Sequence, residues 1–215
     1  MKKEDLYVLI NEMNDDTPYS CSSESISWKA LRRAEKLNDK ALYPILKEII
    51  LENEHKRDVC KRQIRDRAYF IGGKLLANAF DYEFCEFYID RLNCETSKYV
   101  LSSMLDCLAE FDVPQSPNID LIVECTQNEK WQIRFSAIQA LGSFDTNKSR
   151  ECLRTFVNLD DEKRYDYEIV YAQAALGRIG KKEDIKLLQK HANSRKVDMK
   201  ISTRFAIERI ENREV

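Results

Sequence analysis

The side chains that could do acid–base or metal chemistry are few and scattered along the chain. The sequence has two histidines, His55 and His191, and neither has a Cys-x-x-Cys pair beside it. A structural zinc site needs several Cys or His ligands at close spacing, so we expect no metal site. We interpret both histidines as exposed surface residues.

Seven cysteines, an odd number, are spread along the chain without close pairing. They are Cys21, Cys60, Cys85, Cys94, Cys107, Cys125 and Cys152. Secreted proteins usually pair their cysteines in disulfides, whereas unpaired thiols are typical of a reducing compartment. We therefore expect reduced thiols, a cytoplasmic protein and no catalytic residue among the cysteines. A Cys–His nucleophilic pair between distant segments remains the alternative.

Phosphate-binding loops and catalytic carboxylates are equally hard to find. Each of the five glycines lies within or at the end of a segment that we expect to be helical. No glycine-rich loop is therefore left to bind nucleotide phosphates, and we expect no cofactor. Asp160, Asp161 and Glu162 are consecutive and could bind a cation, but we interpret them as a solvated turn between two helices.

The apolar runs are too short for a membrane segment. Spanning a bilayer takes about 18 to 20 apolar residues, and no run in the chain approaches that length. Residues 6–10 form the first apolar run, and Asn11 and Glu12 follow it. This run is too short for a secretory signal, and the residues around it are too acidic. We expect no membrane partner.

A repeated six-residue segment indicates the elements that must position any site. Ala137-Ile138-Gln139-Ala140-Leu141-Gly142 recurs, with small changes, at residues 172–177. Ala137, Ala140 and Leu141 share one face of a helix, where small residues let a neighbouring helix approach, and the glycine can end the helix. Weaker copies begin at residues 72, 104 and 206, so the copies are 32 to 35 residues apart. A period of this length indicates stacked helical hairpins.

A second apolar stretch with helical spacing precedes each copy, and no sustained alternation of apolar and polar residues indicates strands. Residues 6–13 and 26–37 form one further, atypical pair of helices. We predict an all-α fold, an α-solenoid of about six antiparallel helical hairpins in a single domain over residues 1–215. The expected repeats cover residues 1–39, 40–80, 81–113, 117–145, 148–180 and 182–213.

The segment from Ile133 to Gly142 resembles the second-helix signature of HEAT repeats. That signature runs Val-Arg, two variable residues, Ala, two variable residues and Ala-Leu-Gly. The chain is similar above all to the short bacterial HEAT-like repeats that also occur in the phycobilin-lyase group, and more distantly to the DNA-alkylation-repeat proteins. The next copy departs from the signature, because Glu168-Ile169 replaces the Val-Arg pair. HEAT-like arrays serve as scaffolds, lyases and DNA-binding enzymes, so the resemblance implies a fold rather than an activity.

In HEAT-like arrays the second helices line a concave face, and the resemblance implies that a partner would bind there. The candidate binding residues lie off the core face of these helices and are Arg67, Phe70, Lys74, Tyr99, Gln132, Phe135, Gln139 and Tyr167. Aromatic residues suit a binding groove, because rigid rings supply contact area at a small entropic cost. We expect Tyr99 and Tyr167 to be exposed, whereas Phe70 and Phe135 could belong to the groove or to the core.

Charge is unevenly distributed, although the net charge is only −2. Residues 55–74 hold seven Lys or Arg against two Asp, and residues 81–124 hold ten acidic residues against two basic ones. The basic segment predicts a candidate anion-binding patch of Lys61, Arg62 and Arg65, since charges act locally at physiological salt. The alternative is an ordinary solvated helix face with compensating neighbours.

Two functions remain open. The first is a non-enzymatic binding module or scaffold that recognises a protein or peptide through its concave face. The second is a DNA-binding enzyme resembling the alkylation-repeat glycosylases, whose groove is basic and carries Trp and Asp residues. Here Trp28 and Trp131 lie far apart, and the acidic middle of the chain opposes phosphate binding. We favour the binding module, and a bilin lyase is a weaker third alternative.

Overall fold

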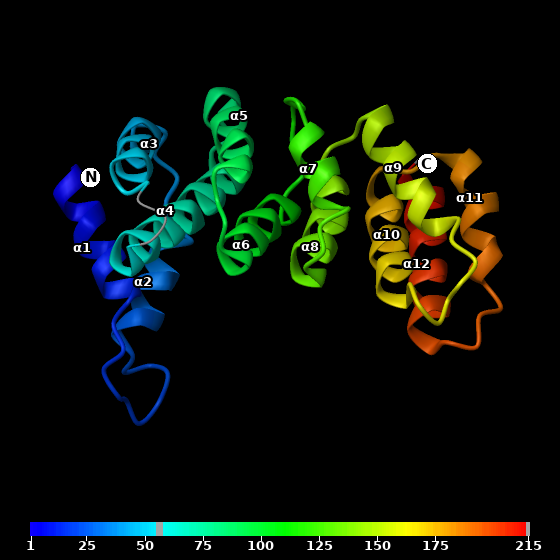
Figure 1. Cartoon of the computed structure of the whole chain (residues 1–215), viewed down its shortest axis with the longest axis horizontal. Helices are drawn as coiled ribbons and strands as arrows, with labels where there is room; N and C mark the ends of the chain where they lie inside the picture. Colours follow the sequence, from blue (N-terminus) through cyan, green and yellow to red (C-terminus); the bar gives the residue numbers. More distant parts are fainter. Residues whose placement is uncertain (55–57, 214–215) are drawn as a thin grey trace. The chain divides into compact units, whose positions relative to one another are not determined.

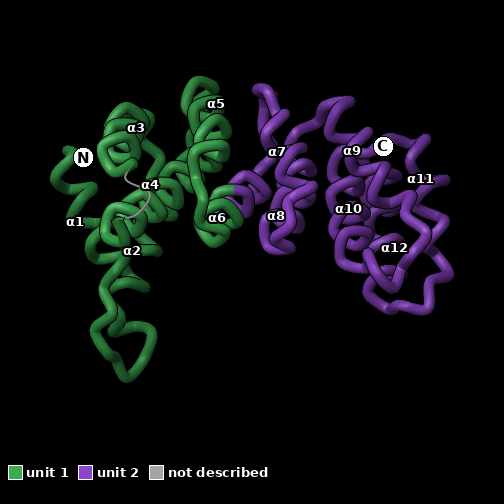
Figure 2. Tube along the Cα trace, in the orientation of Figure 1, with its two compact units in different colours: residues 1–104 green, residues 105–215 purple. Residues whose placement is uncertain are grey.

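The computed structural model describes residues 1–54 and 58–213, which form twelve α-helices and two short 3₁₀ helices and contain no strand (Figure 1). His55 and the basic residues Lys56 and Arg57 lie outside the described residues. The chain divides into two compact units, residues 1–104 and residues 105–215 (Figure 2).

Unit 1 (residues 1–104) contains five whole helices and the start of a sixth. They are α1 (Lys3–Met13), α2 (Ile26–Ala34), α3 (Leu42–Glu52), α4 (Val59–Asn78), α5 (Tyr82–Asp90), the 3₁₀ helix η1 (Arg91–Asn93) and α6 (Lys98–Ala109), which continues into unit 2. Polar side chains fix where three of these helices begin. Ser25, Asp58 and Asp81 each accept a hydrogen bond from a backbone N–H of the first turn, which otherwise has no partner within the helix.

Aromatic side chains hold α3, α4 and α5 together in unit 1. The ring centroids of Tyr43 and Phe84 are 4.5 Å apart, and those of Tyr69 and Tyr88 are 5.7 Å apart in an edge-to-face arrangement. Two of the tyrosines bond to the backbone. The Tyr43 hydroxyl donates to the carbonyl oxygen of Ala79 at 2.7 Å, and the Tyr88 hydroxyl donates to the carbonyl oxygen of Tyr69 at 3.2 Å. These bonds let large rings be buried without leaving their hydroxyls unpaired.

A buried ion pair joins α4 to the segment before α6. Nε of Arg65 donates to Oε1 of Glu95 at 2.7 Å, and its Nη2 donates to Oε2 at 3.0 Å. The two side chains are only 2% and 3% exposed. Arg65 also donates to the carbonyl oxygen of Asn53, and the Tyr69 hydroxyl donates to Glu95 at 3.2 Å. Burial of a charged pair is tolerated only with such a complete set of hydrogen bonds.

Unit 2 (residues 105–215) contains the rest of α6 and six further α-helices. They are α7 (Asp120–Cys125), α8 (Trp131–Leu141), α9 (Asn147–Val157), α10 (Asp166–Ile179), α11 (Lys182–Leu188) and α12 (Val197–Arg213), with the 3₁₀ helix η2 (Gln189–His191) after α11. The second helix of each hairpin carries the repeated signature. Of these helices, α10 packs against both α8 and α12 (Figure 1).

The signature glycines make this packing possible. A Cβ atom built on Gly142 would lie 2.9 Å from the Cα of Ala175, and one built on Gly177 would lie 2.8 Å from the Cα of Ala206. Real Cβ atoms do not approach a backbone so closely. Gly142 follows the last residue of α8, as the sequence predicts, but its φ of −67° is helical. The glycine is therefore needed for the approach of the next helix rather than for a special turn.

The departure from the HEAT signature in the fifth hairpin has a structural use. Glu168 replaces the valine of the signature and accepts a hydrogen bond from Nη2 of Arg134, the signature arginine of the preceding hairpin, at 2.9 Å. The same guanidinium donates to the carbonyl oxygens of Asn128 and Glu129 at 3.0 and 3.1 Å. Arg134 thus links the turn of its own hairpin to the next signature helix.

The prediction that His191 is exposed is wrong. His191 is buried, with Nδ1 2.8 Å from Oε1 of Glu162 and Nε2 2.7 Å from the carbonyl oxygen of Val157. The Ser194 hydroxyl donates to the other carboxylate oxygen of Glu162 at 2.7 Å. The turn at residues 160–162 is solvated at Asp160, as expected, but Glu162 turns inward to bind the next hairpin. Helical periodicity ends before η2 and therefore did not reveal this inward turn.

Replacing Gly177 with alanine tests the close approach of α10 and α12. Alanine is the better helix former by about 1 kcal/mol, so propensity alone predicts a gain in stability. We expect instead that Gly177→Ala loses about 1–3 kcal/mol of unfolding free energy, because its methyl group would overpack against Ala206. Urea denaturation measures the difference. Ala174→Gly, at an exposed position of the same helix, is the propensity control, and a stabilised Gly177→Ala would contradict the packing.

Removing the charge of Glu95 tests the buried ion pair. Glu95→Gln keeps the shape of the side chain but leaves the buried Arg65 cation without a counterion. We expect a loss of about 3–5 kcal/mol in unfolding free energy, as is typical when one partner of a buried pair is removed. Glu52→Gln, which breaks a solvent-exposed pair with Lys3, is the matched control and should cost less than about 1 kcal/mol. Equal losses in the two variants would contradict the assigned role of Glu95.

Candidate functional site

Four aromatic side chains on α8 and α10 form a continuous row on unit 2. On α8, Trp131 and Phe135 are one turn apart, with ring centroids 5.5 Å from each other. Phe135 lies 5.6 Å from Tyr167 and 5.3 Å from Tyr171, which are one turn apart on α10. Trp131 is 57% exposed and Tyr167 is 59% exposed, whereas Phe135 and Tyr171 are half-buried. We call these four residues the aromatic row.

A pocket of about 490 Å³ adjoins the tyrosine end of the aromatic row. It is lined by Asp166, Tyr167, Val170, Tyr171, Lys196, Val197, Asp198 and Met199. Most of these side chains are apolar or aromatic, and Val197 is exposed. One ion pair lies at the pocket: Nζ of Lys196 is 2.6 Å from Oδ2 of Asp166 and holds the pKa of that carboxyl below its usual value. The pocket could take an apolar side chain next to a polar one.

The other candidates on α8 flank the aromatic row. Gln132 and Gln139 are half-buried and lie on the same face of the helix as Phe135, at positions three before and four after it. Their amides could bond to a peptide backbone lying over the rings. The Arg134 guanidinium lies 5.7 Å from the Phe135 ring centroid, so one cation is fixed at the edge of the row.

In unit 1, the candidates on α4 also share one helix face. Arg67, Phe70 and Lys74 are half-buried and are spaced three and four residues apart. Nζ of Lys74 lies 5.2 Å from the Phe70 ring centroid, and Nε of Arg67 donates to Oδ1 of Asn14 at 2.8 Å. Tyr99 is 69% exposed, with Nζ of Lys98 4.9 Å from its ring centroid.

The expected exposure of Tyr99 and Tyr167 is confirmed. Phe70 and Phe135, which could have belonged to the groove or to the core, are both half-buried and so lie between these alternatives. The structure brings Phe135 and Tyr167 together. Trp131 and Tyr171, which complete the row, were not among the candidates. Their signal was present in the sequence, because each lies four residues from a candidate aromatic residue. The aromatic pairs 131/135 and 167/171 are 36 residues apart, one more than the 35 residues between the two signature copies on these helices.

The structure divides the candidate anion-binding patch. The Arg65 guanidinium is buried against Glu95, so it is occupied within the fold. Lys61 and Arg62 are half-buried near the start of α4. Arg62 lines a pocket of unit 1, and Lys61 does not.

Within the described residues, no cluster of three or more Cys, His, Asp or Glu side chains is arranged to hold a metal ion. The seven cysteines are all free. Burial raises the pKa of the Cys85 thiol to about 12 and that of Cys125 to about 11, which disfavours the thiolate at both. His191, the one histidine described, is bonded to Glu162 and Val157.

None of the described helices combines the length and the apolar composition needed to span a lipid bilayer.

Comparison with known proteins agrees with this architecture. Residues 86–174 match the family model for HEAT repeats. A search of curated proteins finds no match to the chain. Among solved structures, an engineered protein (Northeast Structural Genomics Consortium target OR329) is similar with a TM-score of 0.57 at 15% identity, over 99% of this chain and 98% of that one.

Two designed armadillo repeat proteins are also similar. One has a TM-score of 0.52 at 13% identity, over 95% of this chain and 99% of its own. The other, solved in complex with the peptide (KR)4, has a TM-score of 0.54 at 14% identity, again over 95% and 99%. Similarity at such low identity shows the fold alone. The predicted all-α fold is thus confirmed as an α-solenoid, and the resemblance to HEAT repeats is confirmed for residues 86–174.

Proposed function

We propose that this protein is a non-enzymatic binding module that recognises an extended peptide or an exposed segment of another protein. The observation that carries the proposal is the aromatic row on α8 and α10, two of whose rings are more than half exposed. Large exposed rings gathered in one place are typical of interaction surfaces. Tyrosine and tryptophan also dominate the energetics of interfaces, because they bury a large area with few rotatable bonds.

The surroundings of the aromatic row favour a chain-like ligand. Gln132 and Gln139 supply donors and acceptors on either side of Phe135, which suits backbone amides at regular spacing. The pocket beside Tyr167 supplies one place for a side chain. A designed armadillo repeat protein of similar fold was solved with the peptide (KR)4, which supports peptide binding as a use of this fold.

In unit 1 we propose that Arg67, Phe70, Lys74 and Tyr99 form the corresponding surface. These residues are half-buried or exposed and combine rings with cations. The concave face that the HEAT resemblance implies for all eight candidates remains a prediction. A cytoplasmic location is part of the proposal and is supported by the seven free cysteines.

Replacing Tyr167 tests the role of the aromatic row. A ligand peptide would first be selected from a displayed random library against the whole chain. Tyr167→Ala should then weaken the binding of this peptide by about 2 kcal/mol or more, roughly thirtyfold in Kd, because a central interface ring is lost. The melting temperature should barely change, since the ring is more than half exposed. Calorimetric titration and thermal denaturation measure the two effects.

Tyr19→Ala is the matched control, because Tyr19 is similarly exposed but lies in a loop of unit 1 and is not part of the row. A peptide whose affinity falls equally in both variants would contradict the proposal. So would salt-sensitive binding of duplex DNA that survives Tyr167→Ala and is lost on Arg62→Glu, which would favour the DNA-binding alternative.

Thiol reactivity tests the expected redox state. Cys21 and Cys60 are exposed, and a hydrogen bond with Ser23 lowers the pKa of the Cys21 thiol. We expect these two to react rapidly with a disulfide reagent in the native protein and Cys85 and Cys107, both buried, to react only on unfolding. Titration after denaturation without reductant should count seven thiols. A lower count would indicate a disulfide and argue against a cytoplasmic location. The Cys21→Ser/Cys60→Ser double variant should lose the rapid phase.

A further inference from the structure

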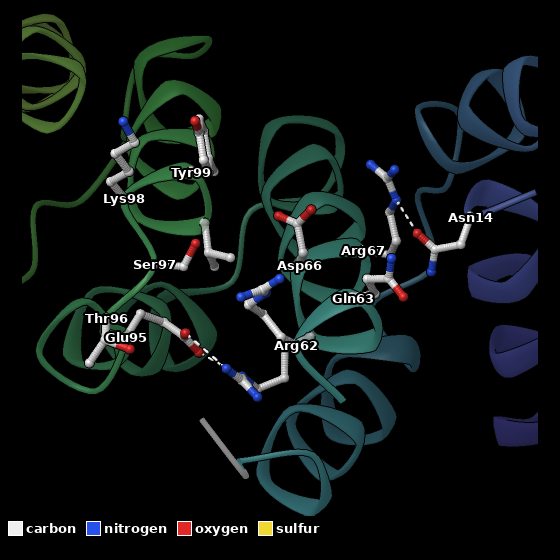
Figure 3. A pocket seen from close by; sticks show the side chains of 12 residues that line it. Asn14, Arg62, Gln63, Asp66, Arg67, Glu95, Thr96, Ser97, Lys98 and Tyr99 are labelled. Carbon is white, nitrogen blue, oxygen red and sulfur yellow. Dashed lines mark hydrogen bonds and ion pairs between the residues drawn. The ribbon is translucent and has the colours of Figure 1, made fainter. Parts of the chain in front are cut away.

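A polar pocket of about 530 Å³ lies between α4 and the start of α6, within unit 1. One side is formed by α4 residues from Arg62 to Arg67, and the other by residues 95–100 (Figure 3). Asn14, just after α1, completes the lining. The pocket shares no residue with the aromatic row of unit 2, but Arg67 and Tyr99 belong both to its lining and to the surface proposed for unit 1.

The buried ion pair sets the charge of the pocket. Arg65 and Glu95 both line it, but their bidentate hydrogen bonds, at 2.7 and 3.0 Å, pair the two charges with each other. The pair also anchors Glu95 to α4 and so fixes the adjoining Thr96 and Ser97, from which α6 begins (Figure 3). The remaining charged groups decide what the pocket attracts.

Three cations remain in the lining against one carboxylate. They are Arg62, Arg67 and Lys98, opposed by Asp66. Arg67 is held by its Nε bond to Asn14, which leaves both of its Nη groups free to bind a ligand (Figure 3). Arg62 has no hydrogen-bond partner among the residues that the structure describes. Burial raises the pKa of Asp66, although Arg67 and Arg62 act against this rise.

We propose that this pocket binds a single phosphate dianion, free or as a phosphomonoester. Two guanidinium groups and one ammonium belong to its lining, and guanidinium forks match the oxygens of phosphate. The net charge of +2 from Arg62, Arg67 and Lys98 against Asp66 matches a dianion. The first-turn N–H groups of α6, which have no acceptor within the helix, add to the positive potential.

A single phosphate fits this charge distribution better than a nucleic-acid backbone does. A backbone would have to continue beyond the pocket, and each further phosphate would need cations of its own. One compact anion meets only the cations of the pocket.

Calorimetric titration of the whole chain tests the site with four probes: a short neutral peptide carrying one phosphoserine, its unphosphorylated form, inorganic phosphate and inorganic sulfate. We expect the phosphopeptide and sulfate to bind and the unphosphorylated peptide not to bind. The affinity for phosphoserine should rise as the pH is raised through about 6, because its second proton leaves there. Sulfate is a dianion throughout, so it reports any change in Asp66 or the cations alone.

Variants separate this pocket from general attraction to a basic helix. Arg62→Gln and Arg67→Gln should each weaken the affinity for the phosphopeptide about tenfold. Lys61→Gln, next to Arg62 but outside the lining, is the matched control and should change the affinity less than about twofold. Asp66→Asn should tighten binding, because it removes the carboxylate that opposes the ligand. Unchanged melting temperatures would show that the variants fold.

The outcomes are distinct. Phosphopeptide binding that responds to Arg62→Gln and Asp66→Asn as stated supports the site. If inorganic phosphate binds as tightly as the phosphopeptide, the ligand is free phosphate. If inorganic phosphate binds more weakly, the ligand is a phosphorylated segment. Absence of binding by phosphoserine and sulfate at millimolar concentration would overturn the proposal. Equal effects of Lys61→Gln and Arg62→Gln would overturn it too, as would duplex DNA binding that phosphoserine does not compete.

Discussion

The arrangement of unit 2 depends on how closely its signature helices approach one another. Gly142, at the end of α8, and Gly177, in α10, have no Cβ, so the backbone of α10 comes closer to those of α8 and α12 than any side chain would allow. This approach removes apolar surface from water and adds many small dispersion contacts. It also determines the aromatic row, because the rings of Phe135 and Tyr171 reach 5.3 Å only when α8 and α10 lie this close. A packing constraint in the core thus shapes the exposed surface.

Unit 1 uses a different constraint at its candidate site. There the buried Arg65–Glu95 pair joins α4 to the segment before α6 at a desolvation cost that its hydrogen bonds must offset. Replacing both residues with apolar ones of similar volume could leave stability unchanged, whereas losing one would not. The pair also cancels a charge at the pocket, so the adjoining cations are opposed by Asp66 alone. Stability and ligand charge are therefore set by the same two side chains.

The sequence predicts which residues share a helix face, but it does not predict which side chains bond to one another. The 32 to 35-residue period and the small residues at 137 and 140 predicted the hairpins, because both follow from helical geometry. Tyr99 and Tyr167 were predicted to be exposed for the same reason. The pairing of Arg65 with Glu95 and of His191 with Glu162 joins residues 30 and 29 positions apart, and no local pattern marks such pairs. Their geometry depends on the turns between helices, where periodicity ends.

The two candidate surfaces differ in the physical origin of their specificity. The aromatic row offers contact area, which binds many sequences and loses little affinity as salt rises, since hydrophobic contact is not screened. The cationic pocket offers charge at one point, which distinguishes a dianion from a neutral group and weakens as salt rises. An α-solenoid can carry both kinds of surface because each hairpin presents its exposed positions independently of its core positions. Recognition in such a fold therefore needs no catalytic constellation, only changes at positions that the packing leaves free.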